Sequence, residues 1–409
     1  MEFLPAWPPD YNVQIAFGVL LFVGVLGGYL AHRISWLPSI TGFMAVGLLI
    51  GPAGIDLFPQ EAIELARPLI DIALALILYR LGLMLDLRTM MRERSLLLVS
   101  LIESIATFIV TFTVLTELGL APFLAGLAAA IVISSSPAVL IHVANEVGAA
   151  GPVTERAKEL VALNNLLAFF VFSAALPFAH FANDASWTTA LLQPLYRLLG
   201  SMAVAALIAL LLVRFARNTR QAPQYRLALV VGALMLGIGI ADALDVSELF
   251  VPLAMGVTVR TLEGDEMISD IEFGEAFELF FIVLFVYAGA KIKPPLIVEI
   301  GGMALALVTA RFAVKWLTVY GLMRWQGFAR RPAAATGLLL MPMAGLAIGL
   351  AQTADSLFAL DAAQLNAIVL ASVAILETIG PPIAAYAFRL SGEAGKLGTG
   401  EAAAPSKAE

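Results

Sequence analysis

The stretch VISSSPAVL, residues 132–140, decides the fold, because three serines and a proline interrupt an otherwise apolar segment. Pro137 has no backbone N–H and clashes with the carbonyl of Ile133, so a helix that continues through this point must break. The stretch LLMPMAGLAIG, residues 339–349, carries a second interruption at Pro342, which lies 205 residues beyond Pro137. Two breaks at matching positions predict one interrupted helix in each of two related halves.

The composition around these breaks is that of a membrane protein. Of the 409 residues, 60% are hydrophobic and 13% are charged, whereas soluble domains carry about 25% charged residues. Thirteen apolar segments, most of them near the length that crosses about 30 Å of hydrocarbon, predict an all-α polytopic protein with about thirteen transmembrane helices. The lipid bilayer is therefore an expected partner.

Several function classes are excluded by residue types that the chain lacks. The absence of cysteine excludes disulfides and thiolate metal sites. The three histidines are scattered along the chain, so a histidine-based metal centre is not expected. A phosphate-binding P-loop is absent, so ATP-driven transport by this chain alone is not expected. We therefore expect no enzyme activity, no cofactor and no nucleic-acid partner.

Basic residues in the loops predict the orientation. In the alternate loops on one side of the thirteen segments lie 17 of the 24 Lys and Arg residues, against three on the other side. The bias puts the N-terminus outside and the C-terminus in the cytoplasm. The expected location of the protein is the (inner) membrane of a prokaryotic cell.

A second pair of related stretches makes the repeat inverted. RLGLMLD around Gly82 and YAGAKIK around Gly289 are 207 residues apart, and the two broken segments face opposite ways in the predicted orientation. Proline and glycine also kink ordinary membrane helices, but two matching breaks favour a secondary transporter with its site at the midplane. The predicted organisation is an extracytoplasmic N-terminus at 1–12, a first six-span repeat at 13–180, a linker span at 181–223, a second six-span repeat at 224–390 and a disordered cytoplasmic tail at 391–409.

Polar residues inside the spans are the candidates for the site. Ser134, Ser135 and Ser136 can satisfy backbone groups that the first break leaves free. Ionisable residues within spans are functional candidates by default, with structural ion pairs and snorkelling side chains as the alternative. Function is favoured for Lys315, both explanations stay open for Arg80, Glu103, Glu278 and Arg311, and Asp242 is a further candidate for charge balance. The structural alternative is the simpler one for Arg197, Asp245, Glu248 and Glu377.

Several motifs together resemble one transporter superfamily. They are LPSITGFMAVGLLIGPAGIDL (37–57), LGLMLDLRTM (81–90), ISSSPAV (133–139), GAAGPVTERAKELVALNNLLAF (148–169), RFAVKWLTVYGLMR (311–324) and ILETIGPPIA (375–384). In this order they resemble the monovalent cation:proton antiporter superfamily, and within it the second, potassium-efflux-like branch. The resemblance implies a sodium/proton-antiporter-like fold with two crossed broken helices, elevator-like alternating access, a homodimer, and a monovalent cation (Na⁺ or K⁺) exchanged for a proton.

The chain departs from the pattern of that superfamily at the binding position. The family has an Asn-Asp or Asp-Asp pair on its sixth span, and the matching residues here are Asn164 and Asn165. The break around Pro137 carries no acid, and Gly345 is followed by Leu346 rather than by glutamate. The basic residue of the eleventh span does match, as Lys315.

An amide at position 165 changes the chemistry of coupling. A carboxylate holds either a cation or a proton, whereas an asparagine offers one oxygen and two N–H donors and does not titrate. Three hypotheses follow: a cation:proton antiporter with atypical or relocated proton coupling, through Glu278, Asp242 or Lys315; an uncoupled or anion-translocating carrier on the same scaffold; and a membrane sensor that has lost transport. The second hypothesis follows from the positive charge that Arg80, Arg311 and Lys315 give the core. That charge is balanced only if Glu103, Asp242 or Glu278 reaches them.

Overall fold

Fifteen α-helices run through the described part of the chain in a computed structural model. The described residues are 11–34, 39–83, 94–182, 187–218, 225–263, 274–292, 294–343, 345–357 and 362–397. The helices are α1 (Val13–His32), α2 (Ser39–Ile50), α3 (Gln60–Leu83), α5 (Arg94–Glu117), α6 (Pro122–Ile131), α7 (Pro137–Glu146), α8 (Pro152–Ala182), α9 (Trp187–Asn218), α10 (Arg226–Ala243), α11 (Phe250–Leu262), α12 (Gly274–Ala290), α13 (Pro294–Trp325), α14 (Arg330–Leu339), α15 (Gly345–Leu357) and α16 (Ala362–Ser391).

Seven of these helices are long and apolar enough to cross a bilayer, and several others are apolar but shorter. The seven lie in α1, α5, α8, α9, α10, α13 and α16. The prediction of an all-α, multi-span membrane protein is therefore confirmed.

Two segments around Pro137 and Pro342 separate consecutive short helices. The first separates α6 from α7, which begins at Pro137 with the Ser136 side chain accepting a hydrogen bond from Val139 N over 3.3 Å. Proline is favoured in the first turn of a helix because the missing N–H has no intrahelical partner there. The second separates α14, which ends at Leu339, from α15, which begins at Gly345.

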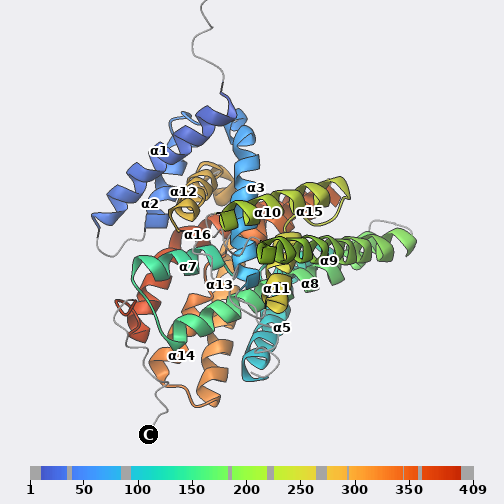
Figure 1. The fold of residues 1–409 in the computed structure, drawn as a ribbon. Helices are drawn as coiled ribbons and strands as arrows, with labels where there is room; N and C mark the ends of the chain where they lie inside the picture. Colours follow the sequence, from blue (N-terminus) through green and yellow to red (C-terminus); the bar gives the residue numbers. More distant parts are fainter. Residues whose placement is uncertain are drawn as a thin grey trace, which may run out of the picture. The chain divides into compact units, whose positions relative to one another are not determined.

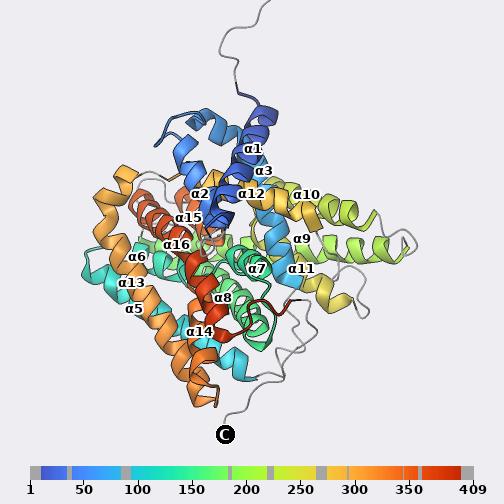
Figure 2. The same ribbon diagram turned by 90° about the vertical axis from the view of Figure 1, so that its left-hand side faces the viewer.

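The chain forms two compact units, and α3 contributes to both. The first comprises residues 1–74 and 273–294, and its helices α1, α2 and α12 lie side by side (Figures 1 and 2). Gly47 and Gly289 allow α2 and α12 to approach closely, since an added Cβ would lie 2.1 Å from Val286 O or 2.2 Å from Met44 O. Small residues at such crossings let helix backbones pack in membranes.

The second unit comprises residues 75–272 and 295–409 and contains both breaks. Within it, α8 packs against α5, α6 and α9, and α16 packs against α14, α15, α7 and α6 (Figure 2). The end of α3 crosses α11 at Gly82 and Gly256, where an added Cβ would lie 2.2 Å from a backbone oxygen of the opposite helix. The four half-helices are therefore held between the long helices α8 and α16.

The C-terminal strap, residues 391–397, folds back onto the start of α8. The Glu393 carboxylate accepts hydrogen bonds of 2.7 Å from Val153 N and Thr154 N, and it also accepts one of 2.6 Å from the Thr154 hydroxyl. An anion at a helix N-terminus satisfies free N–H groups and the positive end of the helix dipole. The expectation that a disordered tail begins at 391 is therefore wrong for the strap, while 398–409 lie outside the described residues.

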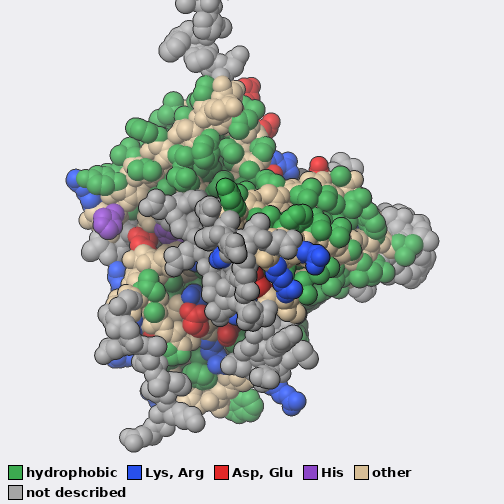
Figure 3. Space-filling model, viewed as in Figure 1, with side chains coloured by type: hydrophobic (Ala, Val, Ile, Leu, Met, Phe, Trp, Pro, Cys, Tyr) green, Lys and Arg blue, Asp and Glu red, His purple; other side chains and the backbone are tan. Residues whose placement is uncertain are grey.

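Exposed apolar side chains cover helices in both units. On α1 they form one stripe, with Phe22 the most exposed at 82%, and on α9 they include Leu207, Leu210 and Leu211. Figure 3 shows hydrophobic side chains gathered over α1 and over α9 and α10. Contiguous exposed apolar side chains of this kind are typical of surfaces that contact another apolar phase, as a lipid bilayer provides.

Candidate functional site

The two breaks contact each other directly through backbone groups. Ser136 N donates to Pro342 O over 2.7 Å, and the Ser135 hydroxyl donates to Leu340 O over 2.8 Å. Ser134, by contrast, turns back to donate to Ile131 O of its own helix over 2.7 Å. Serines at the first break therefore pair with carbonyls that the second break leaves free.

Arg311 of α13 joins both breaks from the side. Its guanidinium donates to Val132 O and Ser134 O at the first break, over 2.8 and 2.7 Å, and to Met341 O and Leu340 O at the second, over 2.6 and 3.3 Å. These carbonyls follow the ends of α6 and α14, where the helix dipole is negative. The side chain is fully buried, so Arg311 neutralises two half-helix ends at once.

Lys315, one turn after Arg311 on α13, forms a buried ion pair. Its Nζ atom lies 2.7 Å from Glu103 Oε1 of α5, and it donates to Ile133 O over 2.8 Å. The Thr107 hydroxyl also donates to Glu103 Oε1 over 2.8 Å. Lys315 therefore has a carboxylate counter-ion, which comes from α5 rather than from α8.

The two amides of α8 lie beside this cluster and are fully buried. Asn165 Oδ1 accepts from Ser135 N over 3.0 Å, and Asn164 Oδ1 accepts from the Ser100 hydroxyl over 2.9 Å. Ser100 and Glu103 share one face of α5, three residues apart. The amides are thus tied to the first break on one side and to the Glu103 helix on the other.

Three polar atoms of this cluster have no hydrogen-bond partner within the described residues. They are Asn164 Nδ2, Asn165 Nδ2 and Glu103 Oε2. Because Ser135 N is a fixed donor, Asn165 must present its oxygen to the break and its NH₂ group elsewhere. A buried donor or acceptor without a partner is costly, so these three atoms are where an ion or water would bind.

The sequence matches a known family along most of its length. The family described as "Sodium/hydrogen exchanger, transmembrane" matches residues 18–388. The chain belongs to this family. A curated relative, "Probable Na(+)/H(+) antiporter 3" of Methanocaldococcus jannaschii, is 24% identical over 364 residues, which are 86% of this chain and 91% of the relative.

The fold of this chain is similar to solved structures of sodium proton antiporters. The sodium proton antiporter MjNhaP1 of Methanocaldococcus jannaschii at pH 8 matches with a TM-score of 0.70 and 20% identity, covering 94% of this chain and 99% of its own. A second structure, determined from an electron-microscopy map of MjNhaP1, gives 0.69 and 19%, covering 92% and 94%. The exchanger is thus a cation:proton transporter of the sodium/proton antiporter type and not an enzyme.

Most of the site residues named from the sequence of this exchanger come together in the second unit. They are Ser134, Ser135, Ser136, Pro137, Asn164, Asn165, Arg311, Lys315, Glu103 and Pro342, with Gly345 at the start of α15. Arg80 and Asp242 lie on other helices: Arg80 is half-buried in the last turn of α3, and Asp242 is exposed in the last turn of α10. The side chain of Glu278 lies outside the described residues.

Sequence reasoning missed the polar stripe of α5. Ser100, Ser104, Thr107 and Thr111 are buried on the same face as Glu103. Their spacing of three and four residues is that of one helical face, so a search for polar periodicity in this span would have found them. From this stripe Ser100 donates to Asn164 Oδ1 and Thr107 donates to Glu103 Oε1.

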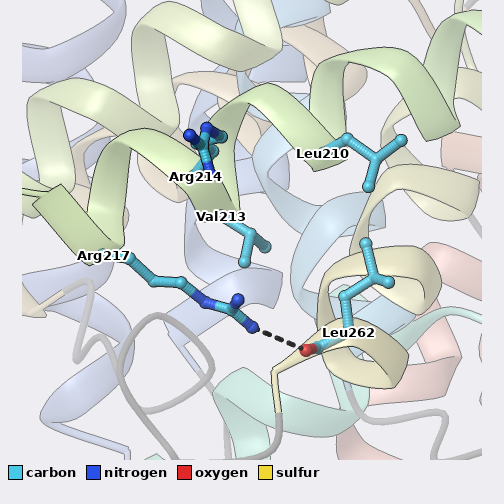
Figure 4. A pocket seen from close by; sticks show the side chains of 5 residues that line it. All are labelled: Leu210, Val213, Arg214, Arg217 and Leu262. Atoms are coloured by element: carbon cyan, nitrogen blue, oxygen red, sulfur yellow. Dashed lines mark hydrogen bonds between the residues drawn. The ribbon is translucent and has the colours of Figure 1, made fainter.

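A separate crevice of about 260 Å³ lies between α9 and α11 (Figure 4). Arg214, Arg217, Leu210, Val213 and Leu262 line it, and Arg217 donates to Leu262 O over 3.3 Å. No acid is among these lining residues, so the crevice offers no carboxylate to a cation. The breaks, rather than this crevice, form the candidate site of the exchanger.

Proposed function

We propose that this protein exchanges a monovalent cation, Na⁺ first among candidates, for a proton at the two breaks. Glu103 binds the cation and Lys315 carries the proton. The observation that carries this proposal is the ion pair of 2.7 Å between the two buried side chains. The lysine ammonium and a bound cation compete for the same carboxylate. This competition couples the flux of protons to the flux of cations.

The exchange follows from this competition. In the cation-free state the Lys315 ammonium neutralises Glu103. A cation that reaches Glu103 Oε2, which has no hydrogen-bond partner among the described residues, replaces the ammonium as counter-ion, and Lys315 then releases one proton to water. Taking up a proton from the other side restores the pair and expels the cation. The charge of the core stays constant, with one proton exchanged for one cation.

The amide at Asn165 takes part in this scheme without titrating. Its oxygen holds Ser135 N at the positive end of α7. Relocation of the carboxylate from α8 to α5 thus leaves the architecture of the breaks in place. The sequence leaves Glu278, Asp242 and Lys315 open as carriers of a relocated proton, and this proposal chooses Lys315, with Glu103 holding the cation.

The number and the arrangement of the membrane spans also belong to this proposal. Joining α6 to α7 and α14 to α15 gives thirteen spans, in two inverted sets of six with α9 between them. The paired glycine crossings support the repeat: Gly82 of α3 meets Gly256 of α11, and Gly289 of α12 meets α2 near Gly47. Movement by an elevator-like alternating access, the N-outside orientation and membership of the potassium-efflux-like branch remain expectations from the sequence.

A homodimer is part of the proposed function, with α1 at the interface. The exposed stripe of α1 consists of Phe22, Val25, Leu26, Tyr29 and Leu30, spaced as one helical face. Because the chain has no native cysteine, a Phe22→Cys variant in membranes should form an oxidant-dependent dimer band on non-reducing gels. A Leu207→Cys variant on α9 is the matched control, and equal cross-linking of both variants would contradict the interface.

An anion carrier is the second candidate, and one observation favours it. The two unpaired Nδ2 donors of Asn164 and Asn165 suit a carboxylate or inorganic anion better than a cation. Thermal-shift measurements separate the two candidates. Stabilisation by Na⁺, K⁺ or Li⁺ and by no anion supports the antiporter, whereas stabilisation by anions alone supports the carrier.

Proton movement in proteoliposomes tests the antiporter directly. The unmodified protein is expected to release or take up protons, seen with a pH-sensitive dye, when Na⁺, K⁺ or Li⁺ is added on either side of neutral pH. The Asn165→Asp variant is expected to exchange cations for protons as well. Its second carboxylate oxygen would replace Asn165 Nδ2, and the ion pair of Glu103 and Lys315 would stay intact. Exchange in the variant alone would contradict the proposal, since it would mean that position 165 is the missing coupling group.

A further inference from the structure

Glu377, in the middle of α16, is a buried acid that the exchange scheme does not use. Its side chain is 4% exposed, and no hydrogen bond or ion pair of its carboxyl group occurs among the described residues. It is the sixteenth residue of a 30-residue helix, so roughly 22 Å of helix separates it from either end. A snorkelling side chain cannot bridge that length, which removes the simplest structural explanation.

Two prolines open the backbone of α16 beside this carboxyl group. Pro381 and Pro382 lie inside the helix and have no N–H to donate to the residue four positions earlier. The carbonyl groups of Glu377 and Thr378 therefore lose their intrahelical donors. A carboxyl group and two freed carbonyl oxygens thus lie on adjacent residues, at membrane depth, where free backbone acceptors need a partner.

This cluster of oxygens adjoins the second break. Gly380, one turn after Glu377, packs on Pro342 so closely that an added Cβ would lie 3.1 Å from Pro342 Cβ. Glu377 and Gly380 are three residues apart and so share a face of α16. The acid therefore lies on the face of α16 that packs against the helix break.

Among the described residues, no charged group on the helices packed around α16 pairs with Glu377. On α7, His142 and Glu146 pair with each other over 3.8 Å, α6 carries no titratable residue, and Arg330 and Arg331 of α14 lie in its first turn. On α16 itself, Tyr386 and Arg389 lie more than two turns away. The side chain of Asp355 on α15 lies outside the described residues.

We infer that Glu377 is a second proton-binding residue of the exchanger, in which the carboxyl group and the freed carbonyls of α16 take up and release one proton in each transport cycle. A neutral carboxyl group with an O–H donor satisfies one freed carbonyl, whereas an unpaired carboxylate there would be a buried charge next to oxygens. The inference rests on the proposed function, and it raises the exchange from one proton per cation to two.

Two measurements on the purified full-length protein test this inference. In proteoliposomes, the number of protons moved per cation is expected to fall by one in Glu377→Gln and to be retained in Glu377→Asp. The infrared band of a protonated carboxyl group is expected in the unmodified protein, to be lost in Glu377→Gln and to persist in Glu103→Gln. Glu117→Gln, at an exposed position of α5, is the matched control for both readouts.

The outcomes separate the inference from the proposed function. An unchanged proton-to-cation ratio in Glu377→Gln, or a carboxyl band that survives this substitution, overturns the inference. Failure of the unmodified protein to couple cations to protons overturns the proposed function instead. In that case the loss of the band in Glu377→Gln alone still supports the proton-binding residue.

Discussion

Glu103→Gln is expected to lower the rate of cation:proton exchange at least about a hundredfold, with the protein still folded. Removing one partner of a buried charged contact weakens binding by about 2–5 kcal/mol, and every 1.4 kcal/mol is a factor of about ten in affinity. The substitution leaves Lys315 without its counter-ion and the cation without its carboxylate, because Glu103 performs both tasks. Glutamine keeps an acceptor for the Thr107 hydroxyl but cannot exchange a cation for an ammonium.

Three comparisons make this result specific to the charge at Glu103. Glu117→Gln removes an exposed acid from the same helix and is expected to leave the exchange rate unchanged. Glu103→Asp keeps the charge at a shorter reach and is expected to retain part of the activity. The double variant Glu103→Gln, Lys315→Met is expected to be more stable in thermal unfolding than Glu103→Gln alone, since no buried ammonium is left unpaired. Normal exchange by Glu103→Gln would refute the assignment.

The sequence is sufficient for the breaks and insufficient for the charge pairing. Pro137 and Pro342 are local signals, because a proline acts on the carbonyl four residues before it. Which acid reaches Lys315 depends on how α5 and α13 pack, and that contact joins residues far apart in the chain. Three acids are open candidates in the sequence, and only the fold separates buried Glu103 from exposed Asp242.

The same limit applies to residues for which the sequence favours a structural explanation. Arg197 does form a pair with Asp245, over 2.9 Å at the surface, as that explanation predicts. The sequence offers the same explanation for Glu377, yet this acid is buried and has no ion-pair partner among the described residues. Both are single charges in apolar segments, and the difference between them is tertiary: Arg197 of α9 reaches Asp245 just beyond the end of α10, whereas no such partner among the described residues meets Glu377.

Arg311→Met is expected to destabilise the exchanger by more than about 3 kcal/mol, seen as a large fall in the apparent melting temperature in detergent. Methionine fills a similar volume but leaves three carbonyl oxygens at the two breaks, those of Val132, Ser134 and Met341, without the Arg311 donor, while Leu340 O keeps the Ser135 hydroxyl. Each buried polar group that loses its partner costs roughly 1–3 kcal/mol. The negative ends of α6 and α14 would also face each other with less compensation.

Arg197→Met provides the matched control, since it removes the same kind of side chain from an ion pair whose acid is 80% exposed. Exposed pairs contribute about 0–1 kcal/mol, so its melting temperature is expected to change little. Arg311→Lys is expected to be intermediate, because an ammonium keeps the charge but cannot span both breaks as the planar guanidinium does. Equal melting temperatures for Arg311→Met and Arg197→Met would contradict the role of Arg311, because one side chain would then not be holding the two half-helix ends together.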